Sequence, residues 1–326
     1  MRVISGIRPS GELHIGNYLG AIKQWIELQE NYECFFFVAD LHALTTPFDP
    51  KILKKEIKDT VISYLALGLD FEKVTLFLQS QISEHSELAW ILGCFTPLGE
   101  LKRMTQFKEK SKEQKGNILA GLLNYPILMA ADILLYKANL VPVGRDQLQH
   151  VELTRDIAKI FNKKFGETFV IPKALLSEGE KIMSLQNPRK KMSKTGDEKG
   201  CIFLFEEPEK ILEKIKKAVT DSGKEIKYDS KRKPGISNLI KIFSLFSGKT
   251  IKEVEKQFKG KTYYDFKLKL AELLIERLSQ FRKKKEEFSK REILIKEILE
   301  KGRKKAKEIA QETMKEVRKK IGLDFF

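Results

Sequence analysis

The sequence predicts an α/β protein in which a doubly wound parallel sheet is followed by an all-helical C-terminal domain. In the first half, short apolar runs of strand length alternate with amphipathic segments of helix length, a pattern typical of parallel sheets covered by helices. In the second half, apolar residues recur three and four positions apart among many Lys and Glu residues, which indicates helices.

The first half is expected to contain four buried strands with helices between them. In a sheet of this kind, ligands bind outside the carboxyl ends of the strands. The expected strands are Arg2–Ser5, Glu33–Ala39, Val74–Gln79 and Leu140–Val143. The expected helices are Ile15–Glu30, Pro50–Leu67, several segments up to Lys137, and Gln147–Lys163.

The strand signals fade after about Lys173. A polar, basic stretch from Glu178 to Gly200 is predicted to be a loop, and the helical pattern starts at Pro208. Long charged helices are expected over Ile275–Lys320. These shifts divide the chain into a predicted sheet domain over residues 1–186 and a predicted loop with a helical domain over residues 187–326.

The composition excludes several classes of protein. The chain has 326 residues, with only three cysteines at unpaired spacings and four histidines without an HExxH motif. A disulfide framework and a dedicated zinc site are therefore not predicted. The apolar runs of the chain are far shorter than the roughly 20 residues of a membrane span. The first residues of the sequence do not resemble a secretory signal. We expect a cytoplasmic protein without membrane segments.

The positive charge lies in the second half. The chain has 61 basic and 45 acidic residues, a net charge of +16. Residues 187–326 contain 39 basic and 23 acidic residues, so they carry the whole excess and the first 186 residues are neutral. This asymmetry suggests a polyanionic partner for the C-terminal half. A solvated helical surface would account for the same charges equally well.

Two motifs suit the binding of phosphates. The segment Gly6–Asn17 follows the first strand, and its end, His14-Ile15-Gly16-Asn17, opens a helix whose free N–H groups attract anions. His14 and Asn17 lie three residues apart and would face the same ligand. In the predicted loop, Lys190–Gly196 offers lysines and hydroxyls that would surround a triphosphate. Each motif alone is more often an ordinary helix start or a surface loop.

Together, the two motifs resemble the HIGH and KMSKS signatures of class I aminoacyl-tRNA synthetases, here written HIGN and KMSKT. Further stretches over the whole chain resemble the bacterial tryptophanyl-tRNA synthetase family, including Gly99–Ser111, Gly121–Tyr136 and Val141–Asp156. The resemblance implies a Rossmann-like catalytic domain and a helical domain that binds the tRNA anticodon. It also implies a homodimer.

The resemblance implies that the chain joins L-tryptophan to ATP, releases pyrophosphate, and passes the tryptophanyl group to tRNA(Trp). ATP would act with Mg²⁺, for which the sequence offers no dedicated protein cage. Adenylate formation needs positioning and charge neutralisation more than a protein nucleophile. The residues implied to be catalytic are His14, Asn17, Lys191 and Lys194.

The resemblance also assigns the two substrate sites. ATP would contact residues of both motifs and of the turn after the fourth strand: Arg8, Pro9, Ser10, Gly16, Asn17, Gly144, Arg145, Asp146, Ile182, Lys191, Met192, Ser193, Lys194 and Thr195. Either Lys112 or Lys115 would reach the phosphates as well. Tryptophan would contact Asp132, Met129, Tyr125, Gln147, His42, Ile4, Val141 and Val143. Asp132 would accept the indole N–H, and Tyr125 and Gln147 would hold the ammonium.

The chain departs from the family pattern at three positions, where Arg8 replaces a glutamine, Asn17 a histidine and Thr195 a serine. Three alternatives stay open: a tyrosine-specific class I synthetase, a non-catalytic RNA-binding descendant, and a small nucleotidyltransferase with a HIGH-type motif. Pyrophosphate exchange that depends on an amino acid would separate synthetases from the other two.

Overall fold

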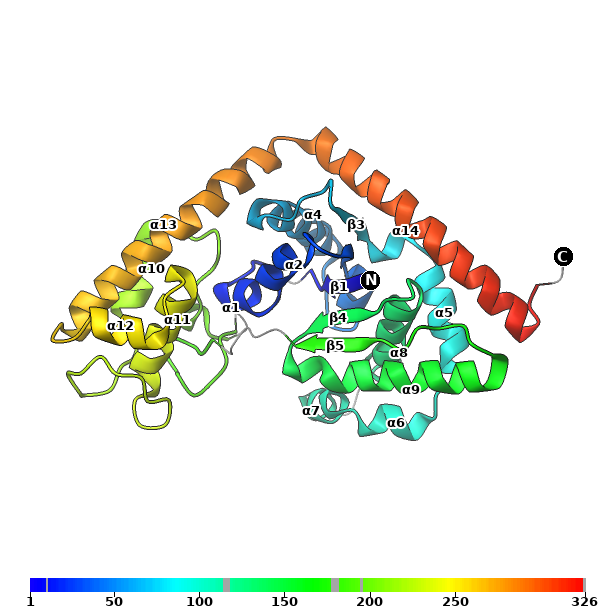
Figure 1. Ribbon diagram of the computed structural model, residues 1–326, viewed down its shortest axis with the longest axis horizontal. Helices are drawn as coiled ribbons and strands as arrows, with labels where there is room; N and C mark the ends of the chain where they lie inside the picture. The colour runs from blue at the N-terminus through cyan, green and yellow to red at the C-terminus, as the bar shows by residue number, and fades with distance from the viewer. Residues whose placement is uncertain (10, 114–117, 177–181, 194–195, 325–326) are drawn as a thin grey trace.

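A computed structural model describes residues 1–9, 11–113, 118–176, 182–193 and 196–324 of the chain (Figure 1). Its centre is a single parallel sheet of five strands in the order β3-β2-β1-β4-β5. The predicted α/β class with a parallel sheet is confirmed. The strands are β1 (Arg2–Ile7), β2 (Glu33–Val38), β3 (Val74–Leu78), β4 (Leu140–Val143) and β5 (Lys173–Leu176).

The fifth strand corrects the prediction that strand signals end near Lys173. β5 pairs with β4 from Leu140–Lys173 to Val143–Leu176, at the edge of the sheet. The strand order changes direction beside β1, because β2 and β3 lie on one side of it and β4 and β5 on the other. Ligands bind at such a switch point, outside the carboxyl ends of the flanking strands. Here those ends are the segments after Ile7 and Val143.

The helix predicted over Ile15–Glu30 is present in three pieces. It consists of α1 (Ile15–Asn17), the π-helical turn η1 (Tyr18–Ile22) and α2 (Lys23–Leu28). The other helices of the first half connect the strands. They are α3 (Asp40–Ala43), α4 (Pro50–Leu67), the 3₁₀ turn η2 (Gln79–Gln81), α5 (Glu84–Gly93), α6 (Leu98–Arg103), α7 (Thr105–Glu113), α8 (Ala120–Leu134), the 3₁₀ turn η3 (Arg145–Gln147) and α9 (Leu148–Phe165).

Alternate residues of each strand face two different cores. On β2, Cys34, Phe36 and Val38 pack with Trp25 and with residues of α4, whereas Phe35 and Phe37 pack with residues of α5, α8 and α9. This period of two is what a strand covered on both faces requires. The second of these cores forms one wall of the candidate site described below.

The C-terminal part is helical, as predicted. It contains η4 (Glu198–Gly200), α10 (Pro208–Lys216), α11 (Pro234–Ser247), α12 (Ile251–Gln257), α13 (Tyr263–Ser289) and α14 (Glu292–Ile321). Figure 1 shows α13 and α14 as two long arms that meet at an angle, with α10, α11 and α12 gathered beside α13. No helix in the described ranges is both long enough and apolar enough to cross a membrane.

Helix α14 does not stay with the other C-terminal helices. Its buried face, which includes Ala306, Ala310 and Met314, packs into the core that contains Phe77 of β3. Gly302 lies directly against the Leu76 backbone, where a Cβ would be 1.8 Å from the carbonyl oxygen. A helix thus covers the edge strand β3. Helix α14 thus returns from the helical part to the sheet. The division of the chain into two domains at residue 187 stays a prediction.

Candidate active site

The first motif caps its own helix. His14 is the buried N-cap residue of α1, and its Nδ1 accepts a hydrogen bond of 3.1 Å from the Gly16 N–H. The Asn17 Oδ1 accepts a bond of 3.0 Å from the His14 N–H, which completes a capping box. Both side chains therefore fix the start of the helix beside the end of β1. Arg8 and Pro9 lie in the same turn, and Ser10 lies outside the described residues.

The segment after the second motif pairs with the first motif. The Ile15 N–H donates to the Ile202 carbonyl at 3.0 Å, and the Leu204 N–H donates to the Leu13 carbonyl at 2.9 Å. His14 and Phe203 consequently form an antiparallel bridge. Backbone hydrogen bonds thus tie the first motif to the segment that follows the second motif, almost 190 positions later in the sequence.

The second motif is anchored by a short antiparallel pairing. The Met192 N–H donates to the Ile182 carbonyl at 2.9 Å, and both side chains are buried. Asn238 of α11 holds the same pairing, because its amide exchanges hydrogen bonds of 2.8 and 2.9 Å with the Met183 backbone. Lys191 and Ser193 are exposed. Lys194 and Thr195 lie outside the described residues, as do Lys115 and the side chain of Lys112.

The turn after β4 brings the Asp146 carboxylate toward Lys191 of the second motif. Gly144 leads into η3, where Arg145 and Asp146 are exposed. Partial loss of hydration acts to raise the pKa of Asp146, but a hydrogen bond of 3.1 Å from the Gln147 amide and the charge of Lys191 hold this pKa below its usual range. Asp146 is therefore ionised at neutral pH and lies within the electrostatic reach of the second motif.

The apolar residues predicted for the amino-acid pocket share one core. Ile4 and Val141 are buried in the cluster on the second face of the sheet, and Met129 and Val143 pack against it half-buried. They come from β1, β4 and α8. These three elements therefore form an apolar wall at the switch point of the sheet.

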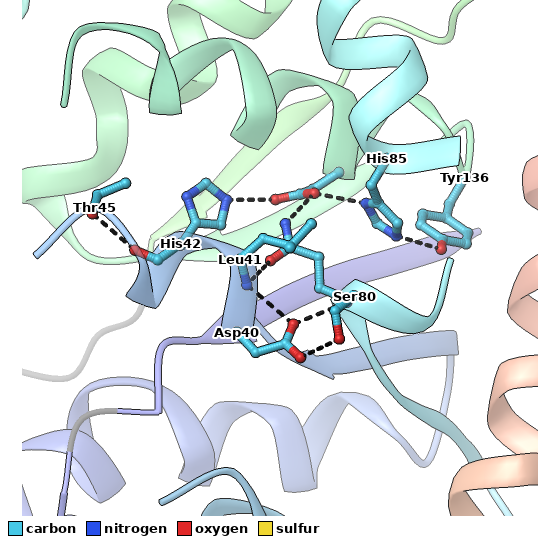
Figure 2. A network of polar contacts seen from close by, with 9 residues as sticks. Asp40, Leu41, His42, Thr45, Ser80, His85 and Tyr136 are labelled. Atoms are coloured by element: carbon cyan, nitrogen blue, oxygen red, sulfur yellow. Dashed lines mark hydrogen bonds and ion pairs between the residues drawn. The ribbon is translucent and has the colours of Figure 1, made fainter. Parts of the chain in front are cut away.

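Asp132 of α8 is the polar centre of this wall, and Figure 2 labels two of its partners, His42 and His85. Its Oδ1 accepts from the Gln79 Nε2 and the His85 Nδ1, both at 2.7 Å, and its Oδ2 contacts the His42 Nε2 at 2.8 Å. The carboxylate is only 2% exposed. Burial alone would raise its pKa, but the hydrogen bonds from His42 and His85 lower the pKa to about 2. Asp132 is therefore a buried anion.

Tyr125 lies on the same helix as Asp132, about two turns earlier. Its hydroxyl donates to the Gln106 Oε1 at 3.1 Å and contacts the His150 Nε2 at 2.8 Å. Burial raises the pKa of Tyr125 to about 12, despite the opposing charge of Arg8. The phenol therefore stays protonated, and its ring meets the His42 ring edge-on at 6.2 Å between centroids.

The matching sequence family confirms what these features indicate. Residues 1–279 match the tRNA synthetases of class I (W and Y). The tryptophan–tRNA ligase of Caldanaerobacter subterraneus subsp. tengcongensis is 54% identical over 324 residues, which are 99% of this chain and 98% of that protein. The ligase of Listeria innocua is 49% identical over 98% of this chain and 97% of its own length. The chain belongs to the tryptophanyl-tRNA synthetase family.

Solved structures of this tryptophanyl-tRNA synthetase family have the same fold. The synthetase of Mycoplasma pneumoniae superposes with a TM-score of 0.92 at 40% identity, and the alignment covers 99% of this chain and 97% of that one. A Campylobacter jejuni synthetase complexed with ADP and tryptophan has a TM-score of 0.84 at 40% identity, covering 99% and 100%. The family, the enzyme class and the Rossmann-like architecture predicted from the sequence are confirmed.

Sequence reasoning missed several polar residues of the candidate site. Gln79, His85 and Tyr136 surround or support Asp132, and Gln106 and His150 hold the Tyr125 hydroxyl. None of them belongs to a motif quoted for its chemistry. The available signal was that His85 and His150 are two of only four histidines, both in segments predicted to be helical.

Proposed function

We propose that the protein activates L-tryptophan with ATP, releasing pyrophosphate, and transfers the tryptophanyl group to the 3′-terminal adenosine of tRNA(Trp). Family membership supports the class of reaction. The observation that supports the amino acid is the ionised Asp132 carboxylate inside an apolar wall, because an indole presents a flat apolar surface and one N–H donor.

The tryptophan site would lie between α8 and the ends of β1 and β4. Asp132 Oδ2 would accept the indole N–H, with Ile4, Met129, Val141 and Val143 against the ring, where Met129 offers a polarizable contact. His42 would close the site beside Asp132. Tyr125 and Gln147 would accept from the substrate ammonium. The amide nitrogen of Gln147 already donates to Asp146, which leaves the amide oxygen as its accepting end.

The ATP site would lie between the two motifs. The start of α1, with Gly16 and the His14–Asn17 capping box, would face the phosphates, together with Arg8, Pro9 and Ser10. Gly144, Arg145 and Asp146 would bind the ribose, where an ionised carboxylate is a good acceptor for hydroxyls. Ile182 and Met192 would lie on the side of the ATP site that binds the adenine ring.

The reaction would place the tryptophan carboxylate in line with the α-phosphorus. A carboxylate oxygen would form the new bond to phosphorus while the bond to pyrophosphate breaks. Lys191 and Lys194 would neutralise the charge that develops on the leaving group, with Ser193 and Thr195 as hydrogen-bond donors. Such groups accelerate the step because they contact the transition state more strongly than bound ATP.

The residues of the site fit a magnesium ion that arrives with the nucleotide. In the described part of the chain, no group of three or more His, Cys, Asp or Glu residues is arranged to hold a metal. Mg²⁺ commonly keeps several waters and binds through substrate phosphates. When bound there, it would screen the phosphate charge, and the lysines of the second motif would complete that screening.

The C-terminal part would bind tRNA. Residues 187–326 carry the whole net charge of +16. A hollow in the helical part is lined by six lysines together with Tyr263 and Tyr264. Lysines attract phosphates, and exposed aromatic rings stack on unpaired bases. The lysines are Lys224, Lys227, Lys252, Lys256, Lys259 and Lys261.

We further propose the organisation predicted from the sequence, with a catalytic part over residues 1–186, an anticodon-binding part over residues 187–326, and a cytoplasmic homodimer as the working form. The dimer rests on analogy with the family. Transfer of labelled tryptophan to tRNA tests the function. We expect ATP-dependent transfer by the wild type and a loss of roughly 10- to 100-fold in kcat/KM for tryptophan in Asp132→Asn. Absence of transfer by the wild type would contradict the proposal.

A further inference from the structure

The hydrogen bonds of Asp132 are unevenly shared between its two oxygens. Oδ1 receives two N–H donors, from Gln79 and His85, and Oδ2 receives one, from His42. A carboxylate oxygen accepts about two hydrogen bonds in its plane. Among the described residues, these contacts therefore fill Oδ1 and leave one accepting position on Oδ2. That position lies on the side of His42, whose ring meets Tyr125.

We propose that Gln79 and His85 are positioning residues which fix the Asp132 carboxylate so that a single accepting position faces the amino-acid pocket. The same contacts direct one N–H of the Gln79 amide and the Nδ1–H of His85 at Asp132, so that these two residues present the pocket with an acceptor. This inference rests on the proposed function, because it explains how the site distinguishes an indole from other rings.

The direction of each hydrogen bond follows from its neighbours. The Gln79 Oε1 accepts from the Leu41 N–H at 3.2 Å, which turns the amide NH₂ toward Asp132. The ionised Asp132 only accepts, so the His85 Nδ1 must carry a proton. Burial raises the pKa of Tyr136 well above its ordinary value, so the phenol keeps its proton. We assign the Tyr136 O–H as donor to the His85 Nε2, at 2.8 Å.

The His85 ring has little freedom to turn away. It is fully buried, and its centroid lies 5.5 to 6.1 Å from those of Tyr136, Phe37 and Phe77. Gln79 is equally buried, at the end of β3. Nearby, Asp40 accepts from the N–H and hydroxyl of Ser80, which joins the ends of β2 and β3 (Figure 2). The positioning groups therefore belong to the rigid frame of the sheet.

The arrangement of donors around Asp132 favours an indole over a phenol. An indole N–H only donates and would fill the open position on Oδ2. A phenol also has acceptor lone pairs, which need a donor once water is excluded. One N–H of Gln79 and the Nδ1–H of His85 are already directed at Asp132. A buried polar group left without a partner is what allows a site to reject a close analogue strongly.

The test compares tryptophan with β-(benzothiophen-3-yl)alanine, an analogue in which sulfur replaces the indole N–H. Pyrophosphate exchange is measured with both amino acids for the wild type and for His85→Phe, His85→Asn and Gln79→Met. We expect the wild type to prefer tryptophan roughly tenfold or more in kcat/KM, the value of one hydrogen bond to a charged acceptor. In His85→Phe and Gln79→Met the preference should fall toward one, with the KM for ATP unchanged.

His85→Asn is the matched control, because an Asn amide can replace the Nδ1–H donor and should keep most of the preference. A purely structural role would lower the activity with both amino acids equally and leave the ratio intact, and this would overturn the proposal. Gln79→Met, which is close to isosteric, decides the matter if His85→Phe does not fold. A wild type that uses both amino acids equally also overturns it. A wild type without any tryptophan-dependent exchange would instead contradict the proposed function itself.

Discussion

His150 connects the site to the pH dependence of folding. Its Nδ1 is buried with no hydrogen-bond partner among the described residues. Burial first, and then the charges of His42 and Lys110, lower the pKa of His150 to about 4, although Asp146 opposes them. The unfolded chain, with an ordinary histidine pKa near 6.5, binds a proton that the folded protein does not bind between about pH 6.5 and 4.

We therefore expect the free energy of unfolding to decrease as the pH falls through this window, with His150 contributing about 2 kcal/mol between pH 7 and pH 5. Urea unfolding at both pH values measures this decrease in the free energy of unfolding. His150→Phe, whose ring cannot titrate, is the comparison. Its stability should fall less over the same interval, even if it is lower at pH 7. Equal decreases in both proteins would show that His150 is not the responsible group.

The lysines of the second motif should act on rate more than on binding. Lys191 lies near the ionised Asp146, and Lys194 is assigned from the family resemblance. Replacing either with Ala removes a charge that is needed chiefly in the transition state, so kcat for exchange should drop by about 10²- to 10³-fold. The KM for tryptophan should stay nearly constant. Equal losses in ATP affinity and in rate would show that these lysines merely hold the nucleotide.

The residues around Asp132 show why part of the site escaped sequence analysis. Asp132 itself follows from the match to a family motif. His85 contacts Asp132 across 47 positions of sequence and Tyr136 across 51. Such pairs come together only when α5 and α8 pack on the same face of the sheet. No local spacing predicts them, and each residue alone is compatible with an ordinary buried helix.

Among the elements, the contact between α14 and β3 depends on one glycine. A Cβ on Gly302 would lie 1.8 Å from the Leu76 oxygen and 2.7 Å from its carbonyl carbon. Backbone atoms of a hydrogen-bonded strand cannot give way easily, so Gly302→Ala must displace the helix. We expect a loss of about 3 kcal/mol in the free energy of unfolding, as for other overpacked interiors.

Gly99→Ala is the matched control for this substitution. Gly99 is also helical, in α6, but a Cβ there would have no atom within 4 Å. Because Ala has a higher helix propensity than Gly, this variant should be as stable as the wild type or slightly more stable. Denaturant unfolding compares the three proteins. If Gly302→Ala were as stable as Gly99→Ala, the close approach of α14 to β3 would be refuted.

The strands differ in how well the sequence predicted them. β1, β2, β3 and β4 each contain a run of apolar residues that ends up buried on both faces. β5 has four residues, of which Lys173 and Leu176 are exposed, and it forms by pairing with β4. β5 is recognised as a strand by its pairing with β4, which the composition of its four residues does not predict. The predicted helix after β1 likewise contains a π-helical turn, which apolar periodicity does not reveal.

For the whole molecule, the charge distribution predicts how tRNA binds. Contacts between lysines and phosphates release counterions, so affinity should fall by at least about tenfold between 50 and 200 mM salt. Filter binding or fluorescence anisotropy with tRNA measures this. Charge reversal at two lysines of the hollow, Lys256→Glu with Lys259→Glu, should reduce the salt dependence and leave tryptophan activation unchanged. An affinity independent of salt would contradict an electrostatic role for residues 187–326.

We propose that this chain activates tryptophan at the switch point of its sheet. The most direct test is the exchange of labelled pyrophosphate into ATP, with tryptophan, with tyrosine and with no amino acid. We predict exchange that requires tryptophan, and a kcat/KM for tyrosine lower by a factor of roughly 10⁴. Exchange without an amino acid would indicate a nucleotidyltransferase, and no exchange a non-catalytic RNA-binding protein. Comparable exchange with tyrosine would contradict the assignment of Asp132 and its pocket to tryptophan.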